Sequence, residues 1–446
     1  MEKLFAAAEK YRQEMQDALD YLWKNPETGY REWKSQEYLK NIYEKLGYTL
    51  TMAGNIPGFY TDLDTGRPGP KILILAELDS LLCLEHPEAD PETGAVHACG
   101  HCAQGAALLG IAAALKEPGV LDDLCGSIRL CMVPAEELIE IGYREELRKQ
   151  GIIRYFGGKP EFLYRGYFDG CDIAYMIHTG GGEPGTFGVH KGNNGCVTKS
   201  IIYHGKASHA GGGPHQGINA LYAANLGLSA INSLRETFKD EDHIRVHPII
   251  TAGGIAVNAI PDTVKLESYV RGAPMDSISE ANVRVNRALA GAAVAMGANV
   301  TLCDRPGYAP LNNDPLLSKY MADAMRTVVP AENVKESDGW GTGCTDMGDL
   351  STIMPVVHPH CAGASGTGHG ADYFITDFES ACMNSAKAQL ALTKMLLENG
   401  AEKAKEVIAN AKPIYASKEE YFAAMDEVTL DCKSVAYDGR SATLNF

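Results

Sequence analysis

KILILAELD, residues 71–79, is a short apolar run that contains two carboxylates near its end. A run this short and this apolar predicts a buried strand. Residues 103–117, AQGAALLGIAAALKE, follow with the composition of a helix, which Pro118-Gly119 closes. A second apolar strand, SIRLCMVPAEE, is predicted at residues 127–137. This alternation of strand, helix and strand predicts an α/β fold with a central sheet.

Further elements of the same kind are predicted on both sides of this core. They are helices at 3–24, 33–46, 314–329 and 377–400, and strands at 171–178 and 351–358. We therefore expect a first domain, a central sheet flanked by helices, that is discontinuous in the chain and comprises residues 1–192 and 305–446.

The pattern between these two segments is different. After Gly192-Asn193-Asn194-Gly195 the chain reads as a strand, a long amphipathic helix, two or three strands, another helix and a final strand. That β-α-β-β-α-β order is typical of the ferredoxin-like arrangement. We expect residues 193–304 to form an inserted α+β domain whose two crossings, near 193 and 304, act as hinges. The tail, 413–446, gives no clear pattern.

The composition limits the class of partner. The 446 residues carry a formal net charge of −17, which argues against nucleic acid or an anionic membrane surface as the main partner. The N-terminal residues are charged throughout, and no stretch reaches 18 uncharged apolar residues. The 12 cysteines are scattered, several of them in apolar runs, which is typical of reduced thiols. We expect a cytoplasmic, soluble protein.

Reactive side chains cluster where the predicted strands end. They are Asp79 after the first strand, Glu136 and Glu137 after the second, His178 after the third, and the His97-x-Cys99-x-His101 motif before the first helix. Each has an ordinary structural interpretation, such as a helix cap, a helix start or a buried filler. Since ligands collect beyond the carboxyl ends of strands in open α/β sheets, we expect these groups to meet at one site. Of two adjacent glutamates, one can bind a metal while the other takes a proton from metal-bound water.

The string CGHC, residues 99–102, allows a different interpretation. A Cys-x-x-Cys pair at a helix start is typical of thiol–disulfide oxidoreductases, which would use Cys99 and Cys102. A cysteine that binds a metal ion must also be a thiolate. A position at a helix N-terminus, which favours the thiolate, therefore does not distinguish the redox interpretation from the metal-site interpretation. Redox chemistry leaves Glu136, Glu137 and His178 without a role, and we rank it below a metal site.

Several of these motifs together resemble a known family. AELDSL (76–81), HACGH (97–101) and PAEE (134–137) are similar to the metal-site motifs of the dimetal amidohydrolases of the aminoacylase/carboxypeptidase G superfamily. The resemblance is to the hippurate and auxin-conjugate hydrolase branch, nearest the aminobenzoyl-glutamate hydrolase and dipeptidase group. It extends to NPETGYREWKSQEYLKNIYEKLGY in the N-terminal helices, and to GKASHAGGGPHQGINAL, NAIPD and YVRGA in the inserted domain.

The resemblance implies a role for each candidate residue of the first domain. Five residues match metal ligands, with Cys99 as the bridge between two ions: Cys99, His101, Glu137, His178 and His369. Glu136 would be the general base on the bridging water and then the proton donor to the leaving amine. Asp79 would orient a ligand. His369, in SGTGHGADY, is assigned by the resemblance alone.

The resemblance also assigns residues of the inserted domain. His209 would reach across a homodimer interface into the partner's site and stabilise the developing oxyanion. Asn258 and Arg271 match substrate-binding positions, and an arginine suits a carboxylate. A structural ion pair is an equal alternative for Arg271, and an ordinary loop histidine is the plain interpretation of His209.

The sequence departs from the family pattern beside the metal motif. The family usually has Asp and His where this chain has Cys102 and Gln104. Neither position is among the five ligands, so the expected set of metal ligands is intact. The two replacements leave open how the neighbouring residues adjust the ligands and which metal the site prefers. The charged segment 138–162 is either a lid near the substrate or a solvated surface helix.

These expectations combine into one function. The chain is expected to be a dimetal enzyme that hydrolyses the amide bond of N-acyl or aryl-acyl amino acids or small dipeptides. Its cofactors would be two zinc or manganese ions per chain, with cobalt as an alternative, and it would act as a homodimer on a small-molecule amide. The alternatives are a metal-binding dimer without turnover and, ranked lower, a thiol–disulfide oxidoreductase.

Overall fold

The computed structural model describes all 446 residues and has a six-stranded central sheet in the first domain. Its order is β1(Thr51–Met52)-β2(Phe59–Asp64)-β6(Ser127–Val133)-β3(Lys71–Glu77)-β7(Ile173–Tyr175)-β17(Val356–Val357). The apolar run of the sequence, β3, lies inside this sheet and pairs in parallel with both β6 and β7. The predicted central sheet is confirmed.

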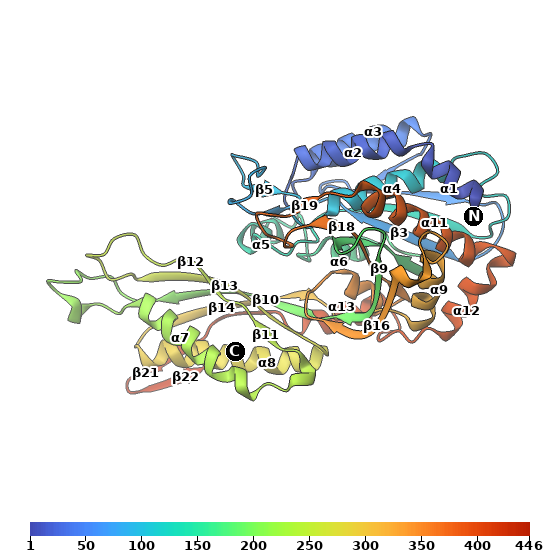
Figure 1. Cartoon of the computed structure of the whole chain (residues 1–446). Helices are drawn as coiled ribbons and strands as arrows, with labels where there is room; N and C mark the ends of the chain where they lie inside the picture. The colour runs from blue at the N-terminus through green and yellow to red at the C-terminus, as the bar shows by residue number, and fades with distance from the viewer.

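The two faces of β3 belong to two separate cores. Ile72 and Ile74 lie in a core with the N-terminal helices and α4, while Leu73 and Leu75 lie in a second core on the other face. A strand buried on both faces has no polar face, which explains its unbroken apolar sequence. Figure 1 shows helices on both sides of this region.

The helices of the first domain divide between these cores. The first core takes α1(Glu2–Glu9), α2(Arg12–Lys24), α3(Trp33–Lys45), α4(His101–Leu115), α9(Pro315–Met325), α11(Ser385–Leu397) and α12(Glu402–Asn410). The second takes α5(Ile141–Lys149), α6(Gly158–Tyr164), α10(Met347–Ser351) and α13(Lys418–Asp426). The predicted helix at 3–24 is two helices, broken at Lys10 and Tyr11. The helix predicted at 377–400 starts as a π-helix, Glu379–Asn384.

A second sheet carries part of the site. It consists of β8(His178–Gly181), β9(Phe187–Asn193), β15(Leu311–Asn312), β16(Val334–Gly341), β18(His360–Ser365) and β19(Phe374–Ile375). The strand predicted at 171–178 is therefore two strands, because β7 belongs to the central sheet and β8 pairs with β18. His178 opens β8, at the junction between the two sheets.

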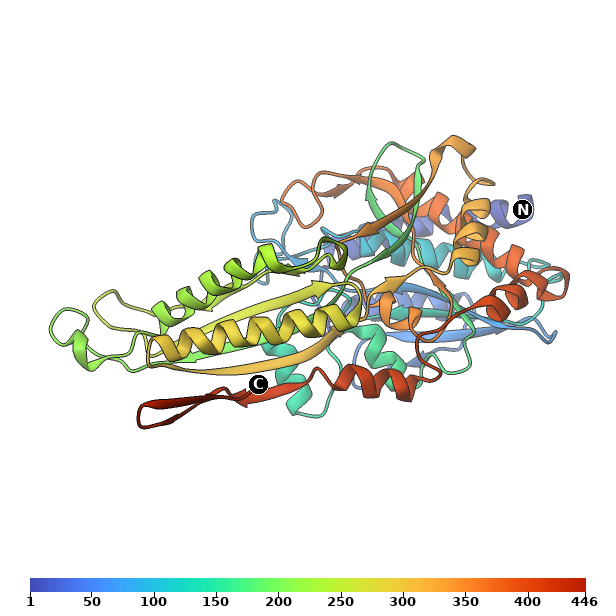
Figure 2. The ribbon, with the colours of Figure 1, turned by 90° about the horizontal axis from the view of Figure 1, so that it is seen from below.

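The inserted segment builds its own sheet and core. Its elements are β10(Gly195–His204), α7(Ala220–Leu234), β11(Arg245–Val246), β12(Ile249–Ala252), β13(Thr263–Gly272), α8(Met275–Ala295) and β14(Asn299–Tyr308). The strands are antiparallel, with β12 on β13, β13 on β10 and β10 on β14. This is the order that a ferredoxin-like fold requires. Figure 2 shows α7 and α8 side by side on one face of the sheet.

The C-terminal tail contacts both parts of the molecule. Helix α13 packs on the first domain, with Phe422 stacked on Tyr155 at 4.7 Å between ring centroids. β20(Leu430–Lys433) then pairs with β14 and adds a strand to the sheet of the inserted domain. The boundary at residue 305 stays a proposal, and residues 430–433, which the predicted boundary assigns to the first domain, lie in the sheet of the inserted one.

The remaining elements are short. β4(Leu81–Leu82) pairs with β5(Ala95–Val96), and β21(Val435–Asp438) with β22(Ser441–Leu444). Turns of 3₁₀-helix occur at Pro214–Gln216, Arg235–Thr237, Asp240–Asp242, Ala331–Asn333 and Asn399–Ala401. No helix combines the length and the apolar character needed to cross a bilayer.

Candidate metal centre

The metal motif lies between β5 and the start of α4. Gly100 has φ = 89°, and a Cβ placed there would come 2.6 Å from the hydroxyl of Tyr373. Glycine is therefore required between Cys99 and His101. The tight turn directs both of these side chains toward β8, where His178 lies.

The five candidate ligands form two groups that share one residue. Cys99, His101 and His178 offer ligand atoms that all lie within 4.8 Å of one another, and so do Cys99, Glu137 and His369. Cys99 Sγ is 3.5 Å from His178 Nε2, and Glu137 Oε1 is 3.2 Å from His369 Nε2. The structure thus brings together five residues that come from strand ends, a helix start and a distant loop.

The chemistry of these atoms fits divalent cations. His101 Nε2 and Glu137 Oε1 are buried and make no hydrogen bond. Buried polar atoms without a partner are rare, and their convergence here is typical of a metal site. Burial raises the pKa of Glu137, but His369, His101 and Cys99 together lower it to about 2, so this carboxylate is ionised. One thiol, three imidazoles and one carboxylate suit zinc and its neighbours.

Asp79 holds two parts of the centre in place. Its backbone carbonyl and Oδ1 lie 2.9 Å and 3.2 Å from His101 Nδ1, so this nitrogen is the donor and Nε2 faces the site. Its Oδ2 accepts the backbone N–H of Glu137 at 2.7 Å. Such a carboxylate–histidine contact fixes the tautomer and orientation of a ligand.

The loop with the two glutamates is held by buried groups on both sides. Ala135 has φ = 59°, and its N–H donates to Glu32 Oε1 at 2.8 Å. Arg144, fully buried, donates to the carbonyls of Ala135 and Glu137. Arg144 comes from α5, so segment 138–162 is not only a solvated surface helix, because it also contributes a buried side chain that supports the loop of Glu136 and Glu137.

Glu136 points into the same space as the ligands. Its Oε2 is 3.8 Å from His101 Nε2, and the hydroxyl of Tyr308 donates to its backbone carbonyl. Burial raises the pKa of Glu136 well above its usual value, and the carboxylates of Glu77 and Glu137 raise it further. The pKa values of the two adjacent glutamates are thus shifted in opposite directions, as in sites that divide acid and base roles.

Two predicted residues lie far out on the inserted domain. His209 and Asn258 are exposed and neighbouring, because the N–H of Ala210 donates to the carbonyl of Asn258 at 2.9 Å. They lie beyond the outer end of β10, whose ten residues span about 30 Å at roughly 3.3 Å each. Figure 1 shows these strands extending away from the first domain.

Arg271 lies at the other end of the inserted domain, beside the metal centre. It pairs with Cys196 at the root of β10, and its guanidinium stands 4.9 Å from the ring centroid of Tyr269. Glu137 raises the pKa of His369 and burial lowers it, and the positive charge of Arg271 lowers it as well. The structure therefore separates Arg271 from Asn258 within one chain.

The Cys-x-x-Cys pair is not a redox couple in this structure. Cys102 is fully buried in the first core, and burial raises its pKa to about 12. Cys99 faces His178 instead. Gln104, the other departure, is buried and bonds Glu77 twice, accepting its backbone N–H at 3.2 Å and donating to its Oε2 at 2.9 Å.

Three residues behind the centre are not among the candidates predicted from the sequence. Lys159 Nζ, without solvent exposure, donates to Glu77 Oε1 and to Asp346 Oδ1, each at 2.5 Å. Glu77 has a sequence signal, since it lies two residues before Asp79 and therefore on the same face of the strand. Lys159 and Asp346 have none, because 82 and 187 residues separate the partners of the two contacts.

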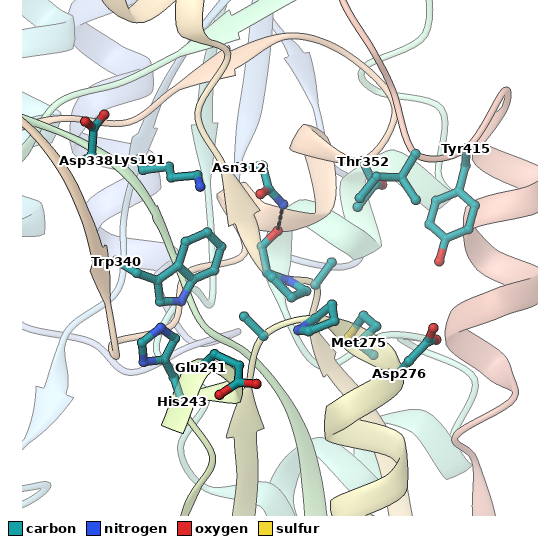
Figure 3. A pocket seen from close by; sticks show the side chains of 15 residues that line it. Lys191, Glu241, His243, Met275, Asp276, Asn312, Asp338, Trp340, Thr352 and Tyr415 are labelled. Atoms are coloured by element: carbon teal, nitrogen blue, oxygen red, sulfur yellow. Dashed lines mark hydrogen bonds between the residues drawn. The ribbon is translucent and has the colours of Figure 1, made fainter. Parts of the chain in front are cut away.

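A cavity of about 500 Å³ lies between the two domains, apart from the metal centre. Figure 3 shows Lys191, Asn312 and Trp340 on one side, facing Glu241 and His243 of the inserted domain. The rings of Trp340 and His243 are nearly parallel, 6.4 Å apart between centroids. None of the five candidate ligands lines this cavity, which adjoins the crossings between the domains.

Known proteins resemble the chain over most of its length. Residues 73–394 match the model of peptidase family M20/M25/M40. The mouse (Mus musculus) Xaa-Arg dipeptidase is 26% identical over 76% of this chain and 74% of its own. Indole-3-acetyl-aspartic acid hydrolase of Enterobacter agglomerans is 29% identical over 77% of both. One of the two chains of the Escherichia coli p-aminobenzoyl-glutamate hydrolase is 29% identical over 65% of this chain and 57% of its own.

Solved structures share the fold. A putative aminohydrolase from methicillin-resistant Staphylococcus aureus superposes with a TM-score of 0.69 at 22% identity, covering 89% of this chain and all of that one. A dinuclear metal-binding peptidase of the M20 family from Bacillus subtilis gives 0.64 at 19%, covering 87% and 99%. With the family match over most of the chain and the ligand cluster in place, the chain belongs to peptidase family M20/M25/M40 and is a metal-dependent hydrolase.

Proposed function

We propose that the chain hydrolyses the amide bond of N-acyl amino acids or small dipeptides, using two divalent ions held through the shared Cys99. The observation that carries this proposal is the pair of ligand groups with Cys99 in common and Glu136 beside them. When bound, such ions supply a water of lowered pKa and polarise the substrate carbonyl. Zinc and manganese are the proposed metals, with cobalt as an alternative.

Glu136 takes the proton in this proposal. It lies beside His101 and is not among the five candidate ligands, and the burial that raises its pKa favours holding a transferred proton. It would remove a proton from the attacking water and deliver it to the leaving amine. Asp79 holds His101 and the backbone of Glu137 so that neither moves during this transfer.

The oxyanion would be stabilised by a second copy of the chain. His209 is an exposed residue at the outer end of the inserted domain, and about 30 Å of strand separates that end from the domain crossing. A partner copy can bring His209, with Asn258 beside it, to the metal centre. Arg271 of the chain whose metal centre is in use, and not of the partner copy, would bind the substrate carboxylate.

An apolar surface on the inserted domain supports a homodimer. β12 is a sheet edge whose four residues are all exposed, Ile249 and Ile250 among them. Ile255 and Val257, in the loop that follows, are fully exposed, and so is most of the Tyr222 side chain on α7. An exposed edge strand beside apolar side chains is a typical pairing surface.

The substrate class follows from the relatives and from Arg271. The relatives are named as a dipeptidase and as hydrolases of acyl-aspartate and aminobenzoyl-glutamate conjugates. Each of these substrates presents a free carboxylate beside the scissile amide, which matches an arginine at the rim of the centre.

One experiment tests the proposal. The protein is purified anaerobically, its metal content is measured, and amino-acid release from N-acyl amino acids, aminobenzoyl-glutamate and dipeptides is assayed with and without chelator. We expect about two ions per chain and hydrolysis that chelator abolishes. A metal-free protein with a reactive Cys99 would contradict the proposal, and full metal content without turnover on this panel would favour the metal-binding dimer.

A further inference from the structure

A buried charge network supports the metal centre from behind. Lys159, from the short buried helix α6, bonds both Glu77 and Asp346, and all three side chains have no solvent exposure. Lys159 Nζ lies 2.5 Å from Glu77 Oε1, so this carboxylate is the charged partner of a buried ion pair. Gln104 occupies a further position on Glu77 Oε2.

The side of Glu77 Oε2 that Gln104 does not occupy faces the metal ligand His101. Glu77 Oε2 is 3.2 Å from His101 Nε2, yet the two atoms form no hydrogen bond, and His101 Nε2 has no other partner. The N–H of this imidazole is on Nδ1, which Asp79 accepts. Both atoms are buried and face the same space, which is the arrangement of two ligands around one cation.

The separation is the one expected of two ligands of one ion. Nitrogen and oxygen atoms that bind the same ion at about 2.0–2.2 Å lie about 3.0–3.5 Å apart. Glu77, His101 and Glu136 indeed form a third group whose ligand atoms all lie within 4.8 Å, and it shares His101 with the group of Cys99 and His178.

We propose that Glu77 is a further ligand of the ion that His101 binds, with Lys159 and Gln104 fixing its carboxylate. The inference rests on the proposed dimetal function. It gives roles to two features that the five-ligand set leaves unexplained, the buried lysine and the glutamine beside the metal motif. It also makes the two sites unequal, because only one of them receives this extra oxygen.

Two variants at one position separate a ligand from a nearby charge. Glu77→Gln removes the charge, and Glu77→Asp keeps the charge but withdraws the oxygen by one methylene. Competition with a graded chelator measures both binding constants, and the visible spectrum of the cobalt-loaded protein reports coordination number. We expect both variants to weaken one ion by about 10- to 100-fold, to leave the other unchanged and to alter the cobalt spectrum.

Controls keep the result independent of folding. Asp304→Asn breaks a comparable buried pair with Lys199 in the inserted domain, where the Nζ–Oδ1 distance is 2.5 Å, and should leave both metal constants unchanged. If Glu77→Gln does not fold, Glu77→Asp, which keeps a carboxylate beside Lys159, carries the test alone. Wild-type metal constants and cobalt spectra in folded Glu77 variants would overturn the inference. Wild-type protein that binds no second ion would instead overturn the proposed function.

Discussion

Glu136 and Glu137 are chemically identical neighbours whose surroundings differ. Glu137 faces His369, whereas Glu136 faces other carboxylates in a buried space. Replacing Glu136 by Gln should lower kcat about 10²- to 10⁴-fold while both ions stay bound, because the base is lost and no ligand is. Steady-state kinetics with metal analysis on the same sample checks this. Loss of an ion from Glu136→Gln would show that Glu136 is a ligand instead.

The two cysteines of CGHC should respond differently to substitution. Cys102→Ala removes a thiol that lies in the first core, and we expect activity and metal content near those of wild type. Cys99→Ala removes the residue common to both ligand groups and should release both ions. Measuring metal content and turnover of both variants tests whether Cys99, and not Cys102, binds the ions. Inactivity of Cys102→Ala with both ions bound would revive the redox interpretation.

The candidate ligands were predictable at the residue level because their motifs are local or follow strand ends. His369 was assigned through the family resemblance alone, and the structure places it 3.2 Å from Glu137. Lys159 and Asp346 were not predictable, because they meet Glu77 only through tertiary packing. A lone lysine in a charged segment has no sequence signal that separates a buried position from a solvated one.

Among the elements, α5 stabilises a loop of the metal centre as well as packing in the second core. It carries Arg144, whose guanidinium binds the carbonyls of Ala135, Glu137 and Phe156 without solvent contact. Arg144→Met should cost about 3 kcal/mol of stability, because three buried carbonyls lose their donor, and should also lower kcat. Denaturant unfolding and kinetics measure the two effects. Lys149→Met, on the exposed side of the same helix, is the control and should change neither.

The elements also show where periodicity is not enough. β3 and α4 were predicted to within a few residues because their apolar runs are uninterrupted. The apolar run at 171–178 predicts one strand, but the chain passes from one sheet to another within it. β7 belongs to the central sheet and β8 to the second sheet, although their sequence is continuous. Which sheet a strand joins depends on residues far along the chain, here those of β17 and β18.

Arg305 connects three elements and gives an expected dependence on pH. It bonds Glu145 of α5 at 3.0 Å and Asp431 of β20 at 2.8 Å. Burial raises the pKa values of both carboxylates, but arginines lower them more, to below their usual range. Stability from these pairs is present above the unfolded pKa values, near 4, and is lost as pH falls through the folded ones.

The corresponding variant is Arg305→Met. Between about pH 5 and pH 3, the Tm of the metal-free wild-type protein should fall more steeply than that of Arg305→Met. Thermal melts across this range, with chelator present throughout, exclude metal release as the cause. Parallel curves would show that the pairs contribute nothing.

At the scale of the whole molecule, the proposed trans role of His209 predicts complementation. Glu136→Gln and His209→Ala homodimers should both be nearly inactive. In a mixed dimer, the site of the His209→Ala chain receives His209 from its partner, so an equal mixture should regain about a quarter of wild-type activity. Assay after exchange of chains between the two homodimers tests this. No recovery in a confirmed mixed dimer would place His209 outside the partner's site.

Strand β20, in the C-terminal tail, limits how far the proposed homodimer could extend. β20 covers the β14 side of the inserted sheet with four residues, two of them charged, which makes a poor template for another strand. The opposite side, β12, stays open and apolar. A sheet that can be extended from one side only joins with one further copy and then has no free side left. If the proposed homodimer forms through β12, the tail leaves no second sheet edge for pairing, and removing residues 430–446 should convert a discrete species into a polydisperse one in analytical ultracentrifugation.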